Sequence, residues 1–462
     1  MRKKLLFLLL FCTVMVANAE NVPTITLCAE VNNEERTLGF EVSTPNTKLF
    51  IDWGDGVSVE TDIIQMPDPY ANATEVTGTP KGDGVIKIYG DNIVYFSCTS
   101  VVGKAQVISV DVTKAVELTE LYVNTNKLTS IDVSKNTKLQ KFYCHNNPIT
   151  SLDISKNSAL TYLNANEIGI DKLDISKCPE LESLYCNLNK LKEIDISQNA
   201  KLKHLYCTNN QIETIDPSQN PVLSTLSISN NLLTSIDVTA CSELKMLMCT
   251  NNQISELKAG KVGTRFNCDK NHLTFSTLPS SNYKNYLYAP QADLIIAEDI
   301  FTGEEVDLSA QDNIKGITDK EQKTTYTWKT IDNETTLEAG KDYTENNGRF
   351  IFLTVPDQPV YCEMASDAFP GFSGTKAFKT TPIKIKQPTG VNNNVSDNII
   401  IVTEKGKVII KGLQTVGNIQ IYTMNGVKTV DTEISSNTMT FTLDRGSYII
   451  RIDNKIYKTI IL

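Results

Sequence analysis

The sequence is poor in histidine and lacks the common catalytic motifs. The 462 residues include three histidines, His145, His204 and His272, and His145 directly follows Cys144. Neighbouring residues of a strand point to opposite faces, so Cys144 and His145 cannot form a catalytic pair. No G-x-S-x-G, H-E-x-x-H or P-loop pattern occurs. We therefore expect no enzyme, no catalytic residue and no cofactor.

Clustered basic residues and long apolar runs are also missing. The 44 basic and 54 acidic residues give a net charge of -10 without a Lys/Arg cluster, so no nucleic-acid partner is expected. Beyond the N-terminus no run reaches the ~18–20 apolar residues of a membrane span. The N-terminal "MRKKLLFLLLFCTVMVANAE" has a basic start, an apolar core and an Ala-Asn-Ala cleavage site, which predicts a signal peptide over residues 1–19. Export without a transmembrane segment follows.

What the chain does have is an internal repeat. One column of leucines recurs every 21 residues: Leu118, Leu139, Leu160, Leu181, Leu202, Leu223 and Leu244. A second column keeps the same phase: Leu121, Phe142, Leu163, Leu184, Leu205, Leu226 and Leu247. Two more apolar columns begin at Leu128 and Ile131 and run in step with these. Four columns in phase indicate stacked coils, because one coil cannot bury its own apolar side.

The repeat follows the template L-x-x-L-x-C-x-x-N-x-I-x-x-I-D-V-S-x-N. It resembles the leucine-rich repeat, whose length is about 20–29 residues. The resemblance implies a mainly β fold, with a solenoid of 21-residue repeats forming a parallel sheet and with β-sandwich domains on either side. In each coil, L-x-x-L-x-C would be a short strand whose alternate residues point inward.

Polar columns mark the turns of each coil. An asparagine recurs at Asn126, Asn147, Asn189, Asn210, Asn231, Asn252 and Asn271. An amide that donates and accepts at once can satisfy neighbouring turns. Ile168 stands where the third coil should have its asparagine, so we expect an irregularity there. An aspartate column from Asp132 to Asp237 suits side-chain-to-backbone bonding at the second turn.

The eleven cysteines invite a disulfide interpretation, but most share columns with core residues. Cys144, Cys186, Cys207 and Cys249 alternate with Val123, Ala165 and Ile228, and Cys268 continues the column. Cys178 and Cys241 share a column with asparagines. Positions that interchange with small apolar residues are core fillers, so we expect buried thiols. Because no C-x₂₋₄-C pair occurs, no metal site is expected.

The outward strand positions carry tyrosine among Asn, Ser, Thr and His. This mixture offers flat amphipathic area with adaptable hydrogen bonds, as in antibody binding loops. We therefore predict these residues as partner contacts: Tyr122, Tyr143, His145, Tyr162, Tyr185, His204 and Tyr206. A second interpretation, compatible with the first, is that the tyrosines stack along the sheet and stabilise it.

Residues 20–92 alternate apolar and polar residues between Gly- and Pro-containing turns, which predicts a β domain capping the solenoid at residues 93–278. Within this cap, Asp52-Trp53-Gly54-Asp55-Gly56 resembles the hairpin of PKD-type β-sandwiches. The two aspartates suggest calcium at first sight. A glycine-rich tight turn explains them better.

Residues 279–388 lack the repeat and alternate short strand-like runs with turns. Trp328, followed 34 residues later by Cys362, resembles an immunoglobulin-like β-sandwich in which the tryptophan packs in the core. No cysteine that could pair with Cys362 lies between the solenoid and Trp328. We expect a sandwich without the disulfide of that family.

Residues 389–462 resemble the C-terminal sorting domain of the type IX secretion system of Bacteroidota. The resemblance rests on a turn at Tyr422-Thr423-Met424-Asn425-Gly426 and on a late strand with Gly446, Tyr448 and Arg451. Thr423 replaces the usual aspartate of that turn. The resemblance implies recognition by the type IX secretion machinery, passage across the outer membrane and attachment at the cell surface. Another small adhesive sandwich is the alternative.

The order of segments resembles that of internalin-like leucine-rich-repeat surface proteins of this phylum. The resemblance implies adhesion to a protein, or a glycan on one, of host or neighbouring cells. The alternative is a structural component of the surface or biofilm matrix that has no specific receptor.

Overall fold

The computed structural model describes residues 22–44, 47–63, 73–100, 106–280, 283, 285–317, 320–387, 399–404, 406–413, 417–424, 426–452 and 455–461. The predicted signal peptide lies outside these ranges. The described residues are almost entirely β, with two short 3₁₀ segments, η1 (Ser309–Gln311) and η2 (Gly374–Lys376). None of their helices is long and apolar enough to cross a membrane. The chain forms two compact units, residues 1–271 with 283–288, and residues 272–282 with 289–462.

The first unit begins with a five-stranded sheet in the order β4-β3-β6-β1-β8. Its strands are β1 (Ile25–Ala29), β3 (Lys48–Asp52), β4 (Ser58–Asp62), β6 (Val85–Tyr89) and β8 (Val107–Asp111). Alternation of apolar residues buries one face, and Leu27 lies opposite Ile86 with both side chains fully buried. β8 comes from the first degenerate coil, so this coil pairs directly with the cap.

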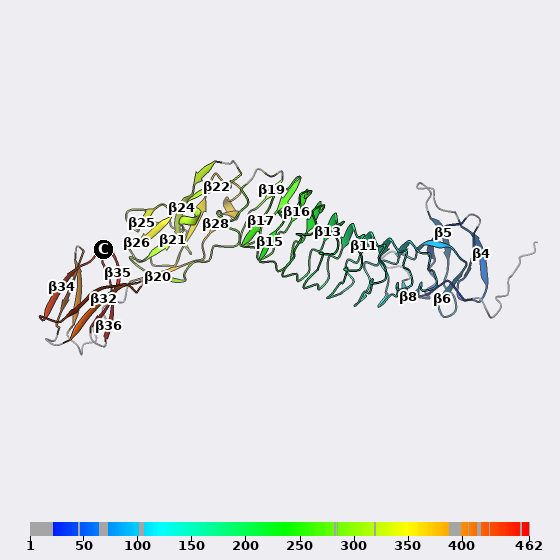
Figure 1. Ribbon diagram of the computed structural model, residues 1–462, viewed down its shortest axis with the longest axis horizontal. Coiled ribbons are helices and arrows are strands. Elements are labelled where there is room, and N and C mark those ends of the chain that lie inside the picture. Colours follow the sequence, from blue (N-terminus) through cyan, green and yellow to red (C-terminus); the bar gives the residue numbers. More distant parts are fainter. Residues whose placement is uncertain are drawn as a thin grey trace, which may run out of the picture. The chain divides into compact units, whose positions relative to one another are not determined.

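A twelve-stranded sheet runs without a break from the cap through the solenoid. Its order is β19-β18-β16-β14-β13-β12-β11-β10-β9-β7-β2-β5. The cap contributes β2 (Arg36–Val42) and β5 (Thr74–Gly78), and β7 (Ile93–Ser97) follows at the start of the segment predicted as solenoid. The coil strands are β9 (Glu120–Tyr122), β10 (Lys141–Tyr143), β11 (Tyr162–Asn164), β12 (Ser183–Tyr185), β13 (His204–Tyr206), β14 (Thr225–Ser227), β16 (Met246–Met248), β18 (Arg265–Asn267) and β19 (Tyr286–Leu287). Figure 1 shows the stack of coil strands from β11 to β19.

Each coil is held by the same inward residues that the sequence repeats. In the coil of β10, Leu139, Phe142 and Cys144 are fully buried, and Ile149 closes the turn that follows. The strands pair in parallel with the predicted register, so Phe142 lies between Leu121 and Leu163. One residue per turn is left-handed, with φ between 54° and 59°: Thr125, Asn146, Glu167, Leu188, Asn209, Asn230, Asn251 and Lys270. Asparagine tolerates this conformation better than most residues, which explains its frequency there.

The asparagine column links successive coils as predicted. Asn147 Nδ2 donates to Val123 O at 3.0 Å and to Cys144 O at 2.9 Å, and its Oδ1 accepts from Leu128 N at 3.0 Å. One amide therefore satisfies backbone groups of two turns. The irregularity expected at Ile168 is present. Gly169 takes a φ of 86°, and Asn189 Oδ1 accepts from Gly169 N instead of from the next residue.

The opposite wall of the solenoid carries a second set of polar columns. In every regular coil an aspartate accepts the backbone N–H two residues ahead, at 2.9 Å in the pair Asp153 and Ser155. In four of these coils a fully buried asparagine follows, as where Asn157 Nδ2 donates to Val133 O and Asn136 O, and in the other two Cys178 and Cys241 take its place. Only β15 (Ser235–Asp237) and β17 (Glu256–Lys258) form a strand pair on this wall of the described solenoid.

The cysteines of the repeat are thiols in the core. Cys144, Cys186, Cys207 and Cys249 are buried in one column, Cys268 is buried at its end, and the described cysteines form no disulfide. Sγ of Cys144 donates to Asn164 O at 3.6 Å, and Sγ of Cys207 donates to Ser227 O at the same distance. The prediction of buried thiols is confirmed for these residues.

The second unit contains short sheets around an aromatic core. Its strands up to residue 387 are β20 (Asp299–Phe301), β21 (Glu305–Asp307), β22 (Asn313–Lys315), β23 (Glu321–Lys323), β24 (Thr325–Thr330), β25 (Tyr343–Asn346), β26 (Arg349–Phe352), β27 (Val360–Ala365), β28 (Phe378–Lys379) and β29 (Lys384–Lys386). Trp328 is fully buried and lies opposite Cys362 in the β24–β27 pair. Phe350 and Phe352 approach the Trp328 ring edge-on, with ring centroids 5.5 and 4.9 Å away.

Residues 399–461 of the same unit form two sheets, ordered β30-β31-β34 and β33-β32-β35-β36. The strands are β30 (Ile400–Glu404), β31 (Lys407–Lys411), β32 (Asn418–Thr423), β33 (Lys428–Glu433), β34 (Thr438–Thr442), β35 (Gly446–Ile452) and β36 (Lys455–Ile461). Val408, Ile421 and Ile450 belong to one shared core. In the turn after β32, Thr423 Oγ1 accepts from Val427 N at 3.2 Å, so threonine supplies the acceptor where an aspartate was expected. Asn425 of this motif lies outside the described residues.

Candidate functional site

Two cross-strand rows form the outward face of the twelve-stranded sheet, which we call the β-face. The first row is Glu41, Tyr95, Glu120, Lys141, Tyr162, Ser183, His204, Thr225, Met246 and Arg265. The second row is Ser97, Tyr122, Tyr143, Asn164, Tyr185, Tyr206, Ser227, Met248 and Asn267. Register places these side chains on one side because outward residues alternate with the buried leucines.

Six aromatic rings of these rows form a continuous stack, the tyrosine ladder. Its members are Tyr95, Tyr122, Tyr143, Tyr162, Tyr185 and Tyr206. Successive ring centroids lie 5.1, 4.3, 4.7, 5.3 and 4.7 Å apart. The pairs Tyr122–Tyr143 and Tyr185–Tyr206 are nearly parallel, at 11° and 7°. Tyr162 joins the stack from the first row and fills the gap that Asn164 leaves in the second.

The ladder is half-buried, and therefore both structural and accessible. Each of its six rings has an intermediate exposure, neither packed in the core nor free in water. Stacked rings contribute about 0.5–1.5 kcal/mol per pair beyond the area they bury. The two interpretations of the tyrosines therefore coexist in the geometry.

The structure brings one of the two predicted histidines against the ladder. The His145 ring meets Tyr143 edge-on, with centroids 6.4 Å apart. Burial lowers the pKa of His145, so its imidazole is neutral at pH 7. Its Nδ1 is buried without a hydrogen-bond partner among the described residues. His204 is half-buried in the first row between Ser183 and Thr225.

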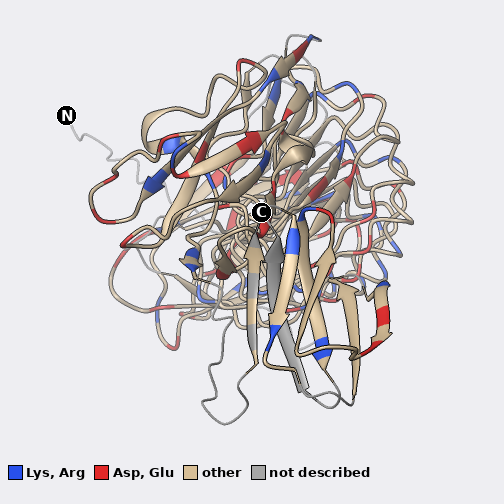
Figure 2. Ribbon diagram, turned by 90° about the vertical axis from the view of Figure 1, so that its left-hand side faces the viewer, with Lys and Arg blue, Asp and Glu red and all other residues tan. Residues whose placement is uncertain are grey.

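Hydrogen bonds and ion pairs hold the cap end of the ladder. Tyr122 Oη donates to Glu120 Oε2 at 3.0 Å, and Lys141 Nζ lies 2.8 Å from Glu120 Oε1. Burial raises the pKa of Tyr162 and of Tyr185 to about 12 each, so these hydroxyls stay protonated. In the view of Figure 2, Lys and Arg are interspersed with Asp and Glu among the residues drawn in colour.

Beyond the tyrosine ladder, the β-face carries small residues and methionines before its rows end at Arg265 and Asn267. Thr225 and Ser227 lie in outward register, yet each is only 4% exposed. Their neighbours in the rows are larger, with His204 and Tyr206 on one side and the methionines of β16 on the other. Met246 and Met248 are both half-buried, so parts of their side chains reach the surface there.

Sequence reasoning missed Tyr95, Glu41 and Glu75. Glu41 and Glu75 belong to the cap, on β2 and β5, and Tyr95 lies on β7, which joins these two strands to the coil strands of the same sheet. A signal for Tyr95 exists, because Ile93, Phe96 and Cys98 repeat the L-x-x-L-x-C spacing one coil ahead of the first regular repeat. No such signal exists for Glu41 and Glu75. Their strands, β2 and β5, pair antiparallel with each other, and β2 pairs antiparallel with β7, between residues far apart in sequence.

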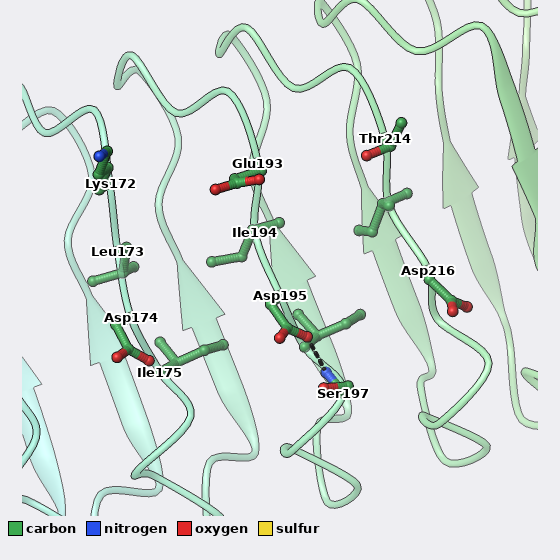
Figure 3. Close-up of a pocket in the computed structure, with 12 residues that line it drawn as sticks. Lys172, Leu173, Asp174, Ile175, Glu193, Ile194, Asp195, Ser197, Thr214 and Asp216 are labelled. Carbon is green, nitrogen blue, oxygen red and sulfur yellow. Dashed lines mark hydrogen bonds between the residues drawn. The ribbon is translucent and has the colours of Figure 1, made fainter.

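A groove of about 450 Å³ on the opposite wall is a second candidate site (Figure 3). It is lined by Lys172, Leu173, Asp174, Ile175, Glu193, Ile194, Asp195, Ile196, Ser197, Thr214, Ile215 and Asp216. Its aspartates already serve the turns, as where Asp195 Oδ1 accepts from Ser197 N. The groove lies where neighbouring coils form no strand pair, so spacing of the coils explains it.

Within the described ranges, no group of three or more His, Cys, Asp or Glu side chains is arranged to hold a metal ion. The aspartates of the cap hairpin have other roles. Asp52 Oδ1 accepts from the backbone N–H groups of Gly54, Asp55 and Gly56 at 2.9 to 3.1 Å. Asp55 pairs with Lys81 at 2.6 Å. The tight-turn interpretation of this motif agrees with these contacts.

Comparison with known proteins adds the family of the repeat. A family model described as Leucine Rich repeats (2 copies) matches residues 179–220. This match, together with the 21-residue period and the parallel register, decides the fold class. The solenoid is a leucine-rich-repeat fold. The search among curated proteins gives no match.

Three solved structures illustrate the similarity of fold. The functional domain of InlJ from Listeria monocytogenes, described as including a cysteine ladder, is 19% identical, with 60% of this chain and 64% of that chain covered and a TM-score of 0.43. The leucine-rich-repeat protein LIC12759 of Leptospira interrogans is 24% identical, with 41% and 50% covered and a TM-score of 0.34. Internalin C2 of Listeria monocytogenes is 21% identical, with 36% and 75% covered and a TM-score of 0.33. The matched region thus spans less than two thirds of the first two solved chains.

Proposed function

We propose that the protein is a cell-surface adhesin that binds a protein, or a glycan on one, through the β-face. The partner belongs to a host cell or a neighbouring bacterial cell. The tyrosine ladder carries this proposal, because it presents six half-buried rings with adaptable polar neighbours on one surface. Rings already held in place lose little conformational freedom on binding.

The flanking segments support display at the surface. Residues 279–388 would act as an immunoglobulin-like spacer, and residues 389–462 as the sorting domain read by the type IX machinery of Bacteroidota. In favour of the second assignment, the late Gly446–Ile452 motif forms β35 at the centre of its sheet, between β32 and β36. The signal peptide proposed for residues 1–19 would begin this export route.

The test adds bulk to the β-face without removing a stacked ring. Ser183 is a small outward residue between Tyr162 and His204, so Ser183→Arg would place a long side chain over the ladder. Binding of the purified full chain to a panel of host cells and bacterial cells should fall at least tenfold. Thr214→Arg, an equal addition at an exposed position of the opposite wall, is the matched control and should bind normally.

Replacing the ladder residues Tyr122, Tyr143, Tyr185 and Tyr206 together by serine is the stronger variant. It should abolish binding, but it also removes stacking energy, so thermal unfolding must be followed alongside. Normal binding by Ser183→Arg and by the serine variant would contradict the site. Failure of the unmodified protein to bind any cell of the panel would favour a structural role in the surface or biofilm matrix.

A further inference from the structure

The cap end of the β-face carries negative charge that the described residues do not neutralise. Glu41 and Glu75 lie on neighbouring strands of the cap, and Glu120 lies across Tyr95 from Glu41. Of these three carboxylates, only Glu120 has an ion pair among the described residues, with Lys141. Two unpaired carboxylates therefore remain beside the first ring of the ladder.

These carboxylates surround Tyr95 closely enough to interact with it. Burial raises the pKa of the Tyr95 hydroxyl, and the negative charges of Glu41, Glu120 and Glu75 raise it further. Burial, followed by repulsion from Glu120, also raises the pKa of Glu41, and the charge of Lys141 offsets only part of this rise. A cation bound here would relieve this repulsion, because an opposite charge favours the ionised carboxylate.

Tyr95 also ends the stack of rings, so one side of its ring has no aromatic neighbour among the described residues. Tyr122 stacks on the other side at 5.1 Å. Gly39 of β2 is buried beneath the Tyr95 ring, because a Cβ atom there would stand 3.2 Å from Tyr95 Cε1. The missing side chain lets this ring lie close to β2, which places it beside Glu41 of β2 and Glu75 of β5.

The opposite end of the first row has the other sign. Arg265 is exposed and has no ion pair within the described part of the chain. Eight strand spacings separate it from Tyr95, about 38 Å at ~4.8 Å each. Charges this far apart are screened at physiological salt, where the Debye length is about 8 Å. Arg265 therefore does not neutralise the carboxylates at Tyr95, and the two ends of the first row carry opposite charges.

We propose that the cap end of the β-face, formed by Tyr95, Glu41, Glu75 and Glu120, binds a lysine or arginine side chain of an extended segment of the protein partner. The cation lies over the Tyr95 ring, within about 6 Å of its centroid, and between the carboxylates. This inference rests on the proposed use of the β-face for adhesion. It adds the chemistry of the partner and the orientation in which the partner docks.

The test uses fluorescent twelve-residue peptides in which glycine alternates with lysine, glutamine or glutamate. Binding to the purified full chain is measured by fluorescence anisotropy. The lysine peptide should bind more tightly than the glutamine peptide, and the glutamate peptide should not bind. In the variant Glu41→Gln/Glu75→Gln the dissociation constant of the lysine peptide should rise about threefold to tenfold.

Glu193→Gln/Glu213→Gln is the matched control, because it makes the same change of net charge at exposed positions of the opposite wall. It should leave the lysine peptide unaffected. Tyr95→Leu should weaken lysine binding about threefold through loss of the cation–π contact alone. The proposal is overturned if lysine and glutamine peptides bind equally, or if the control pair weakens lysine binding as much as the Glu41/Glu75 pair.

The same variants separate this inference from the proposed function. If Ser183→Arg abolishes cell binding while Glu41→Gln/Glu75→Gln leaves it intact, the β-face is adhesive but its partner presents no cation to Tyr95. If neither variant alters cell binding, both proposals fail. The unfolding temperature of each variant checks that it is folded. Removing two like charges is not expected to lower this temperature.

Discussion

Replacing Asn147 by alanine tests how the coils are held together. Its amide is the acceptor for Leu128 N and the donor for Cys144 O, and it lies 4% exposed in the turn between two coils. Val123 O loses the same donor but keeps Asn126 Nδ2 at 3.0 Å. Two buried backbone groups thus lose their partner, at about 1–3 kcal/mol each. We expect a loss of about 3 kcal/mol in the stability of the first unit.

Amide hydrogen exchange of the full chain measures this loss locally. In Asn147→Ala the Leu128 amide should exchange about 100-fold faster, since each 1.4 kcal/mol is a factor of ten. The chain contains its own reference at Ile149. The Ile149 N–H corresponds to the Leu128 N–H one coil later. Ile168 replaces the asparagine that would accept its hydrogen bond, and no described residue accepts a hydrogen bond from it.

In the unmodified protein, the Ile149 amide should therefore exchange faster than the Leu128 amide. Ile168→Asn should slow Ile149 exchange, although loss of the fully buried isoleucine lowers overall stability. Equal exchange at Leu128 and Ile149, together with an unchanged Leu128 rate in Asn147→Ala, would refute the role given to the asparagine column.

Two further predictions concern the cap and the thiols. Gly78→Ala should destabilise the cap by about 1–3 kcal/mol, because its Cβ would lie 2.2 Å from the Trp53 ring; a lower unfolding temperature by tryptophan fluorescence checks this. Burial raises the pKa of Cys98 and Cys144 to about 12, so the fold favours the protonated thiol. Their stabilisation should be complete below pH ~9 and lost as pH rises toward 12, with alkylation at pH 8 occurring only after unfolding in urea. Unchanged stability between pH 9 and 12 would contradict this.

The sequence predicts most of the solenoid because its information is periodic. A column seen seven times reveals which residues face inward, which turn needs an asparagine and why Ile168 is exceptional. The cap has no such period. Its strands β2 and β5 join the solenoid sheet through antiparallel pairs between residues far apart in sequence, such as Gly39 and Glu75. Pairing of this kind has no local signature, so two of the residues that set the charge of the β-face could not be found.

The repeat pattern also does not predict which outward residues of the two rows are buried. Thr225 and Ser227 occupy outward positions by every rule of alternation, and they are nevertheless almost completely buried. Exposure at an outward position depends on the size of its cross-strand neighbours. In a row that runs from tyrosine to serine to methionine, the short side chain is covered by the long ones on either side. The repeat columns predict in which direction a side chain points. Its exposure also depends on the size of its neighbours on the adjacent strands.

The stacking of the ladder strengthens the case for recognition rather than competing with it. An isolated exposed tyrosine loses rotamer freedom when a partner immobilises it, at about 0.5–1.5 kcal/mol for each side chain ordered. Rings 4.3 to 5.3 Å apart along the sheet are already ordered by one another. The energy that stabilises the solenoid therefore also prepares the surface. A variant that breaks the stack, such as Tyr143→Ser, should weaken binding by more than the contacts of that one residue explain.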